Sequence, residues 1–189
     1  MPSWIWIVLL LLGSFFIFKI AYALSIASVL PFTRGAVYVS TSSTRIAAFL
    51  QAVPMRSHQR LVDLGCGDGR VLKRAWQAYG VTGLGYEINP FAYFKARLRC
   101  VGIKGVEIKC RSFWKADLSE ADVVFCYLFP DVMKPLSEKL RSELKPGAVV
   151  VSCNFALPDW HAEQVLRPNN PNHGDPIYIY YSGSKDSRP

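Results

Sequence analysis

A glycine-rich loop between two apolar segments constrains the fold of this chain more than any other feature. Residues 60–64 are apolar enough for a buried strand, glycines follow at alternate positions, and residues 68–79 have a helical pattern. Glycine lets backbone N–H groups approach a ligand closely, and a helix N-terminus adds a positive potential there. The next apolar segment, 82–87, ends in Glu87, 24 positions after Asp63, where a carboxylate can bind a ribose diol.

Two carboxylates beside the loop indicate the kind of ligand. Asp63 and Asp68 flank the glycines, and a carboxylate repels a pyrophosphate but attracts a cation. A dinucleotide site also favours glycine or alanine near the position that Arg70 occupies. S-adenosylmethionine carries a sulfonium, an ammonium and a ribose diol, and it has no phosphate. The alternative is a plain strand, turn and helix in which the acids have no role.

The pattern resembles motif I and the following acidic motif of class I S-adenosylmethionine-dependent methyltransferases. The resemblance implies that the loop, its flanking carboxylates and the end of the second strand bind S-adenosylmethionine. The implied cofactor residues in this part of the chain are Asp63, Gly65, Cys66, Gly67, Asp68, Gly69, Glu87 and Ile88.

The order of elements predicts an α/β fold. Residues 122–128 form a continuous apolar run, which is typical of a central parallel strand. Alternating strands and helices imply a doubly wound, Rossmann-like sheet with right-handed crossovers. The expected strands are 60–64, 82–87, 105–110, 122–128 and 148–153, and the expected helices are 46–50, 68–79, 90–100 and 130–143.

The C-terminal part differs from this alternation. Residues 165–166 and 177–181 flank a turn-rich stretch, 168–174. About ten residues leave no room for a crossover helix, so these segments are predicted to form a hairpin. Six parallel strands and one antiparallel strand make the seven-stranded, mostly parallel sheet of class I methyltransferases. The methyltransferase domain is expected over 35–181, followed by a polar, disordered tail at 182–189.

The N-terminal segment is apolar enough to cross a membrane. A span of about 20 apolar residues crosses a bilayer, and residues 4–26 satisfy this with Lys19 near one end, where it can snorkel. Trp4 and Trp6 occupy the position of an interfacial aromatic belt. Residues 1–34 are therefore predicted to be a single-pass membrane anchor and its juxtamembrane segment. Two alternatives are a signal peptide, cleaved at the small-x-small sequence 21–23, and a buried N-terminal helix.

The basic residues around this segment predict its orientation. Arg34, Arg45, Arg56 and Arg60 follow the apolar run, and no acidic residue precedes Asp63. The positive-inside rule places the following domain in the cytoplasm. From residue 35 onward the chain has 20 basic and 14 acidic residues. That excess is compatible with nucleic acid, but no basic run with interleaved aromatics is present, which favours a solvated surface beside a membrane.

The cysteines and histidines do not have the spacing of metal ligands. The five cysteines form no C-x-x-C pair, and the three histidines are scattered. Reduced, mostly structural thiols in a reducing compartment are expected, and no metal site is predicted.

The remaining candidate site residues follow the ends of later strands. Ligands of open parallel sheets bind beyond the carboxyl ends of the strands. Ser112 and Phe113, after the third strand, offer a polar contact and an apolar wall for adenine. The methyl-acceptor side is expected to contain the catalytic candidates Tyr127, Phe129 and Pro130 and the substrate candidates Phe155 and Trp160. Ordinary core and loop packing is the alternative for each of them.

Aromatic residues at these positions suit an amine acceptor. Methyl transfer is an in-line displacement at a sulfonium, so the attacking amine must first lose a proton. Partial desolvation between aromatic walls favours the neutral amine, and cation–π attraction holds the amine beforehand.

A narrower resemblance is carried by 63–70, 85–90, 127–133 and 155–160, together with the N-terminal anchor. These segments resemble the FAM173 group of membrane-anchored lysine methyltransferases, which act on mitochondrial membrane proteins including the ATP synthase c subunit and the adenine nucleotide translocator. Cys66 stands where the animal members are expected to have serine. The compact tail looks bacterial, and the chain has no Arg-rich transit peptide. The resemblance implies protein-lysine methylation, with a lysine of a membrane protein as the expected substrate. The anchor and the compact tail predict a protein of the bacterial inner membrane.

Two other functions remain open at this point. An anchor and an aromatic pocket equally suit methylation of a lipid or a small hydrophobic molecule. The second open function is that of a non-catalytic S-adenosylmethionine-binding protein. The intact glycine loop argues against it, because the cofactor site has not degenerated. Nucleic-acid methylation is disfavoured, because residues 127–130 lack the Asn/Asp-Pro-Pro-aromatic motif of enzymes that methylate base amino groups.

Overall fold

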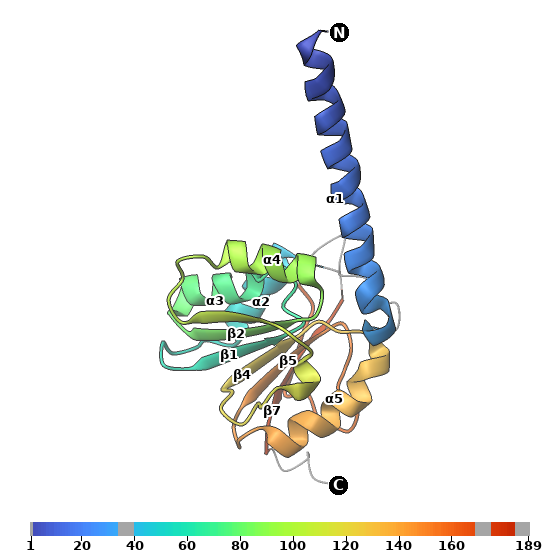
Figure 1. Ribbon diagram of the computed structural model, residues 1–189. Helices are drawn as coiled ribbons and strands as arrows, with labels where there is room; N and C mark the ends of the chain where they lie inside the picture. The colour runs from blue at the N-terminus through green and yellow to red at the C-terminus, as the bar shows by residue number, and fades with distance from the viewer. Residues whose placement is uncertain (1, 34–39, 169–174, 184–189) are drawn as a thin grey trace.

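The computed structural model describes residues 2–33, 40–168 and 175–183 of the chain (Figure 1). An α/β domain carries a long N-terminal helix, α1 (Ser3–Thr33), which projects well beyond the domain. The predicted class I methyltransferase architecture is confirmed. Its strands and helices occur along the chain in the predicted order.

The domain is built on one seven-stranded sheet with the strand order β3-β2-β1-β4-β5-β7-β6. Its first five strands pair in parallel, as the alternation of strands and helices predicts. They are β1 (Arg60–Leu64), β2 (Thr82–Glu87), β3 (Val106–Cys110), β4 (Val123–Cys126) and β5 (Val149–Cys153).

The two C-terminal strands form the predicted hairpin. β6 (Gln164–Leu166) and β7 (Ile177–Tyr181) pair in antiparallel fashion, and β7 also pairs antiparallel with β5. The antiparallel strand therefore lies between β5 and β6, one place in from the edge of the sheet. Residues 169–174 of the connecting turn lie outside the described residues. The predicted disordered tail begins at Ser182, but Ser182 is buried and its N–H donates to the Ala148 carbonyl, whereas residues 184–189 are outside the described part.

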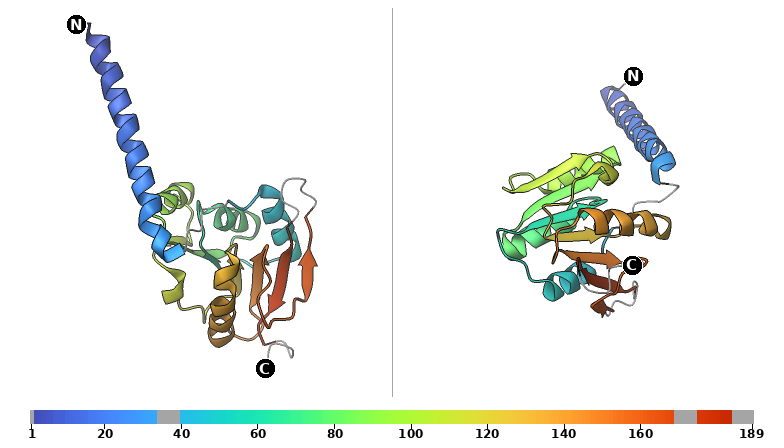
Figure 2. Two further views of the ribbon diagram at one scale, coloured as in Figure 1. Left: turned by 90° about the vertical axis from the view of Figure 1, so that its right-hand side faces the viewer. Right: turned by 90° about the horizontal axis from the view of Figure 1, so that it is seen from below.

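Helices cover the two faces of the sheet unequally (Figures 1 and 2). One face packs against α2 (Ser43–Ala52), α3 (Arg70–Tyr79) and α4 (Pro90–Arg99), and the other against α5 (Pro130–Glu143) and the short 3₁₀ helix η1 (Phe113–Lys115). Apolar side chains from alternate strand positions fill both layers. The strand β4 is buried at every position because it lies between β1 and β5.

Local signals in the sequence explain most helix ends. The side chain of Ser42 accepts a hydrogen bond from the Arg45 N–H and caps α2, and Asn89 caps α4 by accepting from the N–H groups of Phe91 and Ala92. Serine and asparagine are favoured at such cap positions, and the predicted start of the helix at residue 90 is confirmed. The fourth strand is shorter than predicted, because the backbone leaves the ladder after Cys126 and continues extended into α5.

The helix α1 has the length and composition of a membrane-spanning segment. Its part Ser3–Leu24 is the single candidate span in the described chain, and none of its most apolar window is buried in the domain. A signal sequence has the same properties. The helix contacts the domain through aromatic side chains. Phe18 and Tyr22 pack edge-on against Phe91 of α4, with ring centroids 5.7 and 5.0 Å from that of Phe91.

Candidate active site

The glycine loop connects β1 to α3 in a conformation that needs glycine. Gly65, Gly67 and Gly69 all have positive φ, between 56° and 78°, which side chains other than glycine adopt only with strain. The N–H groups of Gly65 and Cys66 both donate to the Tyr86 carbonyl at 2.9 Å. These bonds fix the loop against the end of β2 at the carboxyl edge of the sheet.

Glu87 joins the loop to the start of α4. Its carboxylate accepts hydrogen bonds from the Gly67 N–H at 2.9 Å and from the Asn89 N–H at 2.8 Å. Burial raises the pKa of Glu87, although these backbone donors lower it in part. Each carboxylate oxygen keeps a further lone pair. The side chain is therefore held rigidly where it can accept hydrogen bonds from a diol.

Asp63 is the buried carboxylate at the centre of the site. It is 2 % exposed, and among the described residues its Oδ2 has no hydrogen-bond partner. Burial and the negative charges of Glu87 and Asp68 raise its pKa well above the ordinary value. A positively charged ligand beside Asp63 favours the charged carboxylate and so offsets this shift in pKa. The orphaned oxygen thus fits the cationic amino-acid part of S-adenosylmethionine.

Asp68 differs from the other two carboxylates. Arg70 donates two hydrogen bonds to it, at 2.9 and 2.7 Å, and Arg99 of α4 donates one at 2.8 Å. Burial alone raises its pKa, but the two guanidinium groups outweigh burial and hold the pKa below its usual value. Its charge is compensated inside the protein. Attraction for a cation therefore comes from Asp63 and Glu87, and Asp68 fastens the loop to α4.

A narrow cavity opens beside the loop, between the start of α2 and the end of β4. Several residues that line the cavity were predicted from the sequence. Arg70 and the segment before α2 also line it and were not predicted. Arg70 Nη1 donates to the Thr41 carbonyl at 3.2 Å, a contact between residues 29 positions apart that no local pattern reveals. The cavity is lined by Ser40, Thr41, Asp63, Gly65, Cys66, Gly67, Asp68, Arg70, Val71, Phe125 and Tyr127.

Five predicted cofactor residues are not among those that line this cavity. Gly69 ends the glycine loop and Glu87 ends β2, and the other three are Ile88, Ser112 and Phe113. Ile88 is half-buried directly after Glu87. Ser112 caps η1, since its Oγ accepts from the Trp114 N–H, and Phe113 packs against Trp114 with ring centroids 4.7 Å apart. The contacts of Ser112 and Phe113 with the adenine ring, and that of Ile88 with the cofactor, stay predictions.

Tyr127 forms a polar cluster with two residues that the sequence analysis did not select. The Arg45 guanidinium lies 5.1 Å from the centroid of the Tyr127 ring, and Asn154 Nδ2 donates to the Tyr127 hydroxyl at 3.2 Å. Arg45 is 1 % exposed and pairs with Asp175 at 2.5 Å. Burial lowers the pKa of Arg45, but the neighbouring Tyr127 and the Asp175 carboxylate outweigh burial and raise it, so Arg45 is a fixed cation.

Asn154 follows β5 in a strained conformation. Its φ is 72°, which asparagine tolerates better than most residues, and its N–H donates to the Pro176 carbonyl at 2.8 Å. Its Oδ1 is buried without a partner among the described residues. The sequence signal that could have identified Asn154 is its position immediately after a predicted strand. The free oxygen beside Tyr127 is an unused hydrogen-bond acceptor.

The other acceptor-side candidates are not all brought together. Phe129 is exposed and caps the start of α5 at Pro130, and Phe155 is half-buried near the α5 layer. Trp160 is buried in that same layer, where it packs edge-on against Tyr180. Tyr127 packs on the opposite face of the sheet. The expected channel containing both Tyr127 and Trp160 is therefore not formed, because their side chains belong to different layers.

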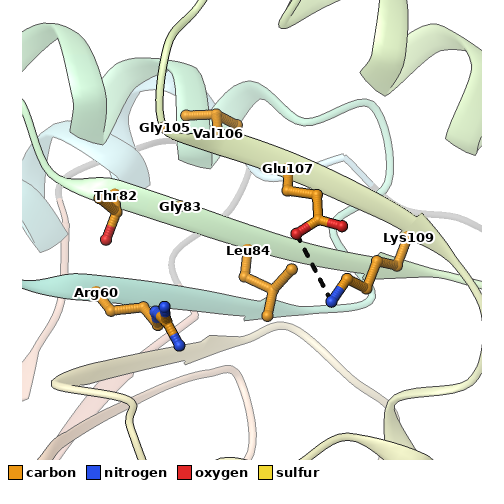
Figure 3. Close-up of a pocket in the computed structure, with 8 residues that line it drawn as sticks. All are labelled: Arg60, Thr82, Gly83, Leu84, Gly105, Val106, Glu107 and Lys109. Carbon is orange, nitrogen blue, oxygen red and sulfur yellow. Dashed lines mark ion pairs between the residues drawn. The ribbon is translucent and has the colours of Figure 1, made fainter.

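A separate hollow of about 440 Å³ lies on the same face of the sheet as α5, near the amino ends of β1, β2 and β3 (Figure 3). Leu84 is at its floor, and Glu107 and Lys109 form an ion pair of 3.6 Å across one side. It contains neither the loop N–H groups nor the buried carboxylates. Within the described residues no group of three or more potential metal ligands occurs.

Fold and site together define a class I S-adenosylmethionine-dependent methyltransferase: a parallel sheet with one inserted antiparallel strand, a glycine loop after β1 and an acidic residue ending β2. The family model of the ANTKMT methyltransferase domain matches residues 63–164, more than half of the chain. A protein-lysine N-methyltransferase of Saccharolobus islandicus is 33 % identical over 77 % of this chain and 93 % of its own length. The chain belongs to this family, the FAM173 family of methyltransferases.

Two further relatives extend the comparison. The mouse adenine nucleotide translocase lysine N-methyltransferase is 35 % identical over 68 % of this chain, which spans 57 % of that protein. The crystal structure of an RNA methyltransferase from Salinibacter ruber, in complex with S-adenosyl-L-homocysteine, has a TM-score of 0.71 and 32 % identity. The superposition covers 78 % of this chain and 95 % of the Salinibacter ruber chain. The predicted family and cofactor are thus confirmed.

Proposed function

We propose that this protein is a membrane-tethered enzyme that methylates a lysine side chain of a membrane protein. The observation that carries the proposal is the packing of Phe18 and Tyr22 on Phe91, which lies four residues after Glu87. The apolar helix α1 is thereby joined to the wall of the cofactor site. Relatives named as lysine methyltransferases support an amine acceptor.

The cofactor site is assigned to the loop and its two uncompensated carboxylates. When bound, S-adenosylmethionine supplies a methyl group activated by a positively charged sulfur. Glu87 accepts hydrogen bonds from the ribose diol, and Asp63 balances the positive charge of the amino-acid part. The loop also packs closely on the segment after β4, because a Cβ at Gly65 would lie 3.2 Å from the Leu128 side chain.

The acceptor amine is assigned to the cluster at the ends of β4 and β5. Asn154 Oδ1 and the Tyr127 hydroxyl accept hydrogen bonds from the amine N–H groups, which leaves the nitrogen lone pair free to face the methyl group. Arg45, held behind the Tyr127 ring, disfavours a second cation and hence the ammonium form. The proton leaves to solvent before attack. Phe129, which is exposed at the start of α5, is assigned to the apolar wall along the lysine stem.

The localisation follows from the anchor. We propose a single-pass protein of the bacterial inner membrane, with residues 4–26 in the bilayer and the catalytic domain in the cytoplasm. External protease added to intact cells should leave the domain uncut. Cleavage of the domain under those conditions, or recovery of the full chain in the soluble fraction, contradicts the tethered arrangement.

The acceptor class is tested by incubating the full-length protein with methyl-labelled S-adenosylmethionine and fractionated membranes. Label in protein, released as methyl-lysine on hydrolysis, is the expected result. Label in the lipid extract supports instead the methylation of a lipid or a small hydrophobic molecule. A protein that binds the cofactor but labels nothing is a binding protein. The Glu87→Ala variant is the control for contaminating activities.

A further inference from the structure

The helix α4 presents an apolar face that no described part of the domain covers. Phe94 and Leu98 of the helix are 58 and 59 % exposed, and Val101, which follows the C-cap residue Cys100, is 73 % exposed. Their spacing of four and three residues places them on one side of a helix. The opposite side, which includes Ala96 and Cys100, is buried in the domain core.

The same side of α4 touches the anchor helix. Phe91, one helical turn before Phe94, is the residue on which Phe18 and Tyr22 of α1 pack. Figure 1 shows α1 leaving the domain beside α4, which lies across the side of the domain from which α1 projects. A bilayer crossed by residues 3–24 therefore begins near the level of Phe91.

Positive charge is concentrated in this part of the chain. Residues 90–115 contain seven basic residues and one acidic residue, whereas the remainder of the chain after residue 34 contains 13 of each. The whole excess charge of the domain thus lies in α4, β3, η1 and the turns that join them. The exposed basic side chains of this segment are Lys95, Arg97, Arg99, Lys104, Arg111 and Lys115.

We infer that α4 lies in the membrane surface, with Phe94, Leu98 and Val101 inserted between lipids and the basic residues on anionic headgroups. Apolar side chains flanked by lysine and arginine are the pattern of helices that lie in the interface plane. The inference rests on the tethering by α1 proposed above. It gives the catalytic domain two attachments to the bilayer, which fixes the orientation of the carboxyl edge of the sheet relative to a membrane-protein substrate.

A basic surface with an exposed Phe94 and Trp114 also has the composition of an RNA-binding surface. The lipid surface is favoured because the apolar residues continue from Phe91, which the anchor already contacts. RNA is therefore an outcome of the test.

The test places a nitroxide label at position 98 of the full-length protein in lipid nanodiscs. The variant Leu98→Cys is made in a Cys110→Ser background, because Cys110 is the exposed member of the five cysteines. The matched control is Ser142→Cys, an exposed position one residue from the end of α5, at the amino edge of the sheet. Depth is measured from the accessibility of each label to oxygen and to a water-soluble nickel chelate.

In nanodiscs containing phosphatidylglycerol, we expect the label at position 98 about 5–10 Å below the headgroup level and the label at position 142 in water. A water-exposed label at position 98 overturns the inference, as does immobilisation of that label by added RNA in place of lipid. Hydrogen exchange of the unlabelled protein tests the same point without a label that could perturb the helix. We expect exchange over residues 90–101 to be slower in anionic nanodiscs. Unchanged exchange there also overturns the inference. Failure of the protein to remain in nanodiscs at all contradicts the tethering by α1 instead.

Discussion

Asn154 Nδ2 donates a hydrogen bond of 3.2 Å to the hydroxyl of Tyr127, joining the ends of two strands that are neighbours in the sheet. The bond orients the hydroxyl and leaves Asn154 Oδ1 buried without a partner in the described structure. Two acceptors for an amine are thus held side by side at the carboxyl edge, behind which lies the Arg45 guanidinium.

The first prediction concerns the Tyr127 hydroxyl. Tyr127→Phe should lower turnover by about 100-fold, as expected for a lost positioning or proton-handling group, and leave cofactor affinity unchanged. Initial rates and calorimetry measure the two quantities. The matched control is Tyr79→Phe, which removes a hydroxyl bonded to the Leu50 carbonyl within the α2 and α3 layer. A wild-type rate for Tyr127→Phe reduces Tyr127 to a packing residue.

The second prediction concerns the amide of Asn154. Asn154→Gly retains the positive φ but removes both amide groups, so the backbone can keep its path. We expect turnover to fall by about tenfold or more, the equivalent of one lost hydrogen bond. Asp159→Gly, at the other non-glycine residue with positive φ, is the control and should keep its activity. Equal effects of the two substitutions show that only loop geometry matters.

The third prediction concerns Glu87. Glu87→Ala should weaken cofactor binding by about 1.5–3 kcal/mol, the usual value of hydrogen bonds to a charged group. It also leaves the N–H groups of Gly67 and Asn89 without their acceptor. Calorimetry with S-adenosylhomocysteine measures the change, and Glu107→Ala, an exposed carboxylate on β3, is the control. Unchanged affinity would show that the ribose does not bind Glu87.

The order of the early elements and the cofactor loop could be predicted because their signals are local. Glycines with positive φ, an asparagine cap and an acid at the end of a strand act within a few residues of each other. Arg45 and Thr41 reach the site only through the packing of α2 against the carboxyl edge, which no spacing in the sequence encodes. Trp160 has the residue type of a pocket wall, but its place in the core depends on Tyr180 of β7, inserted between β5 and β6.

The fourth prediction concerns the pH dependence of stability through Asp63. Burial raises the pKa of Asp63, so the folded ligand-free protein holds this proton more tightly than the unfolded chain does. The stabilisation is complete below the ordinary aspartate value and is lost as the pH rises through the folded-state pKa. Above the ordinary aspartate pKa the buried carboxyl therefore destabilises the fold, either through the proton it retains or as a buried charge.

Asp63→Asn should therefore raise the melting temperature of the ligand-free protein at pH 7–8, with the difference shrinking as the pH falls. The same variant should bind S-adenosylhomocysteine, which retains the ammonium, more weakly. Thermal unfolding across this pH range measures the first effect and calorimetry the second. A variant that melts below the wild type at pH 8 indicates that Asp63 is compensated in the ligand-free protein.

The most direct test of the proposed function is the identification of the methylated residue in membranes. Membranes from cells lacking this protein are incubated with the purified full-length enzyme and deuteromethyl-labelled S-adenosylmethionine, and their proteins are digested and sequenced by mass spectrometry. The account predicts labelled methyl groups on a lysine of a membrane protein, greatly reduced with Tyr127→Phe at saturating cofactor. Label confined to lipid or to RNA, with no labelled lysine, would contradict it.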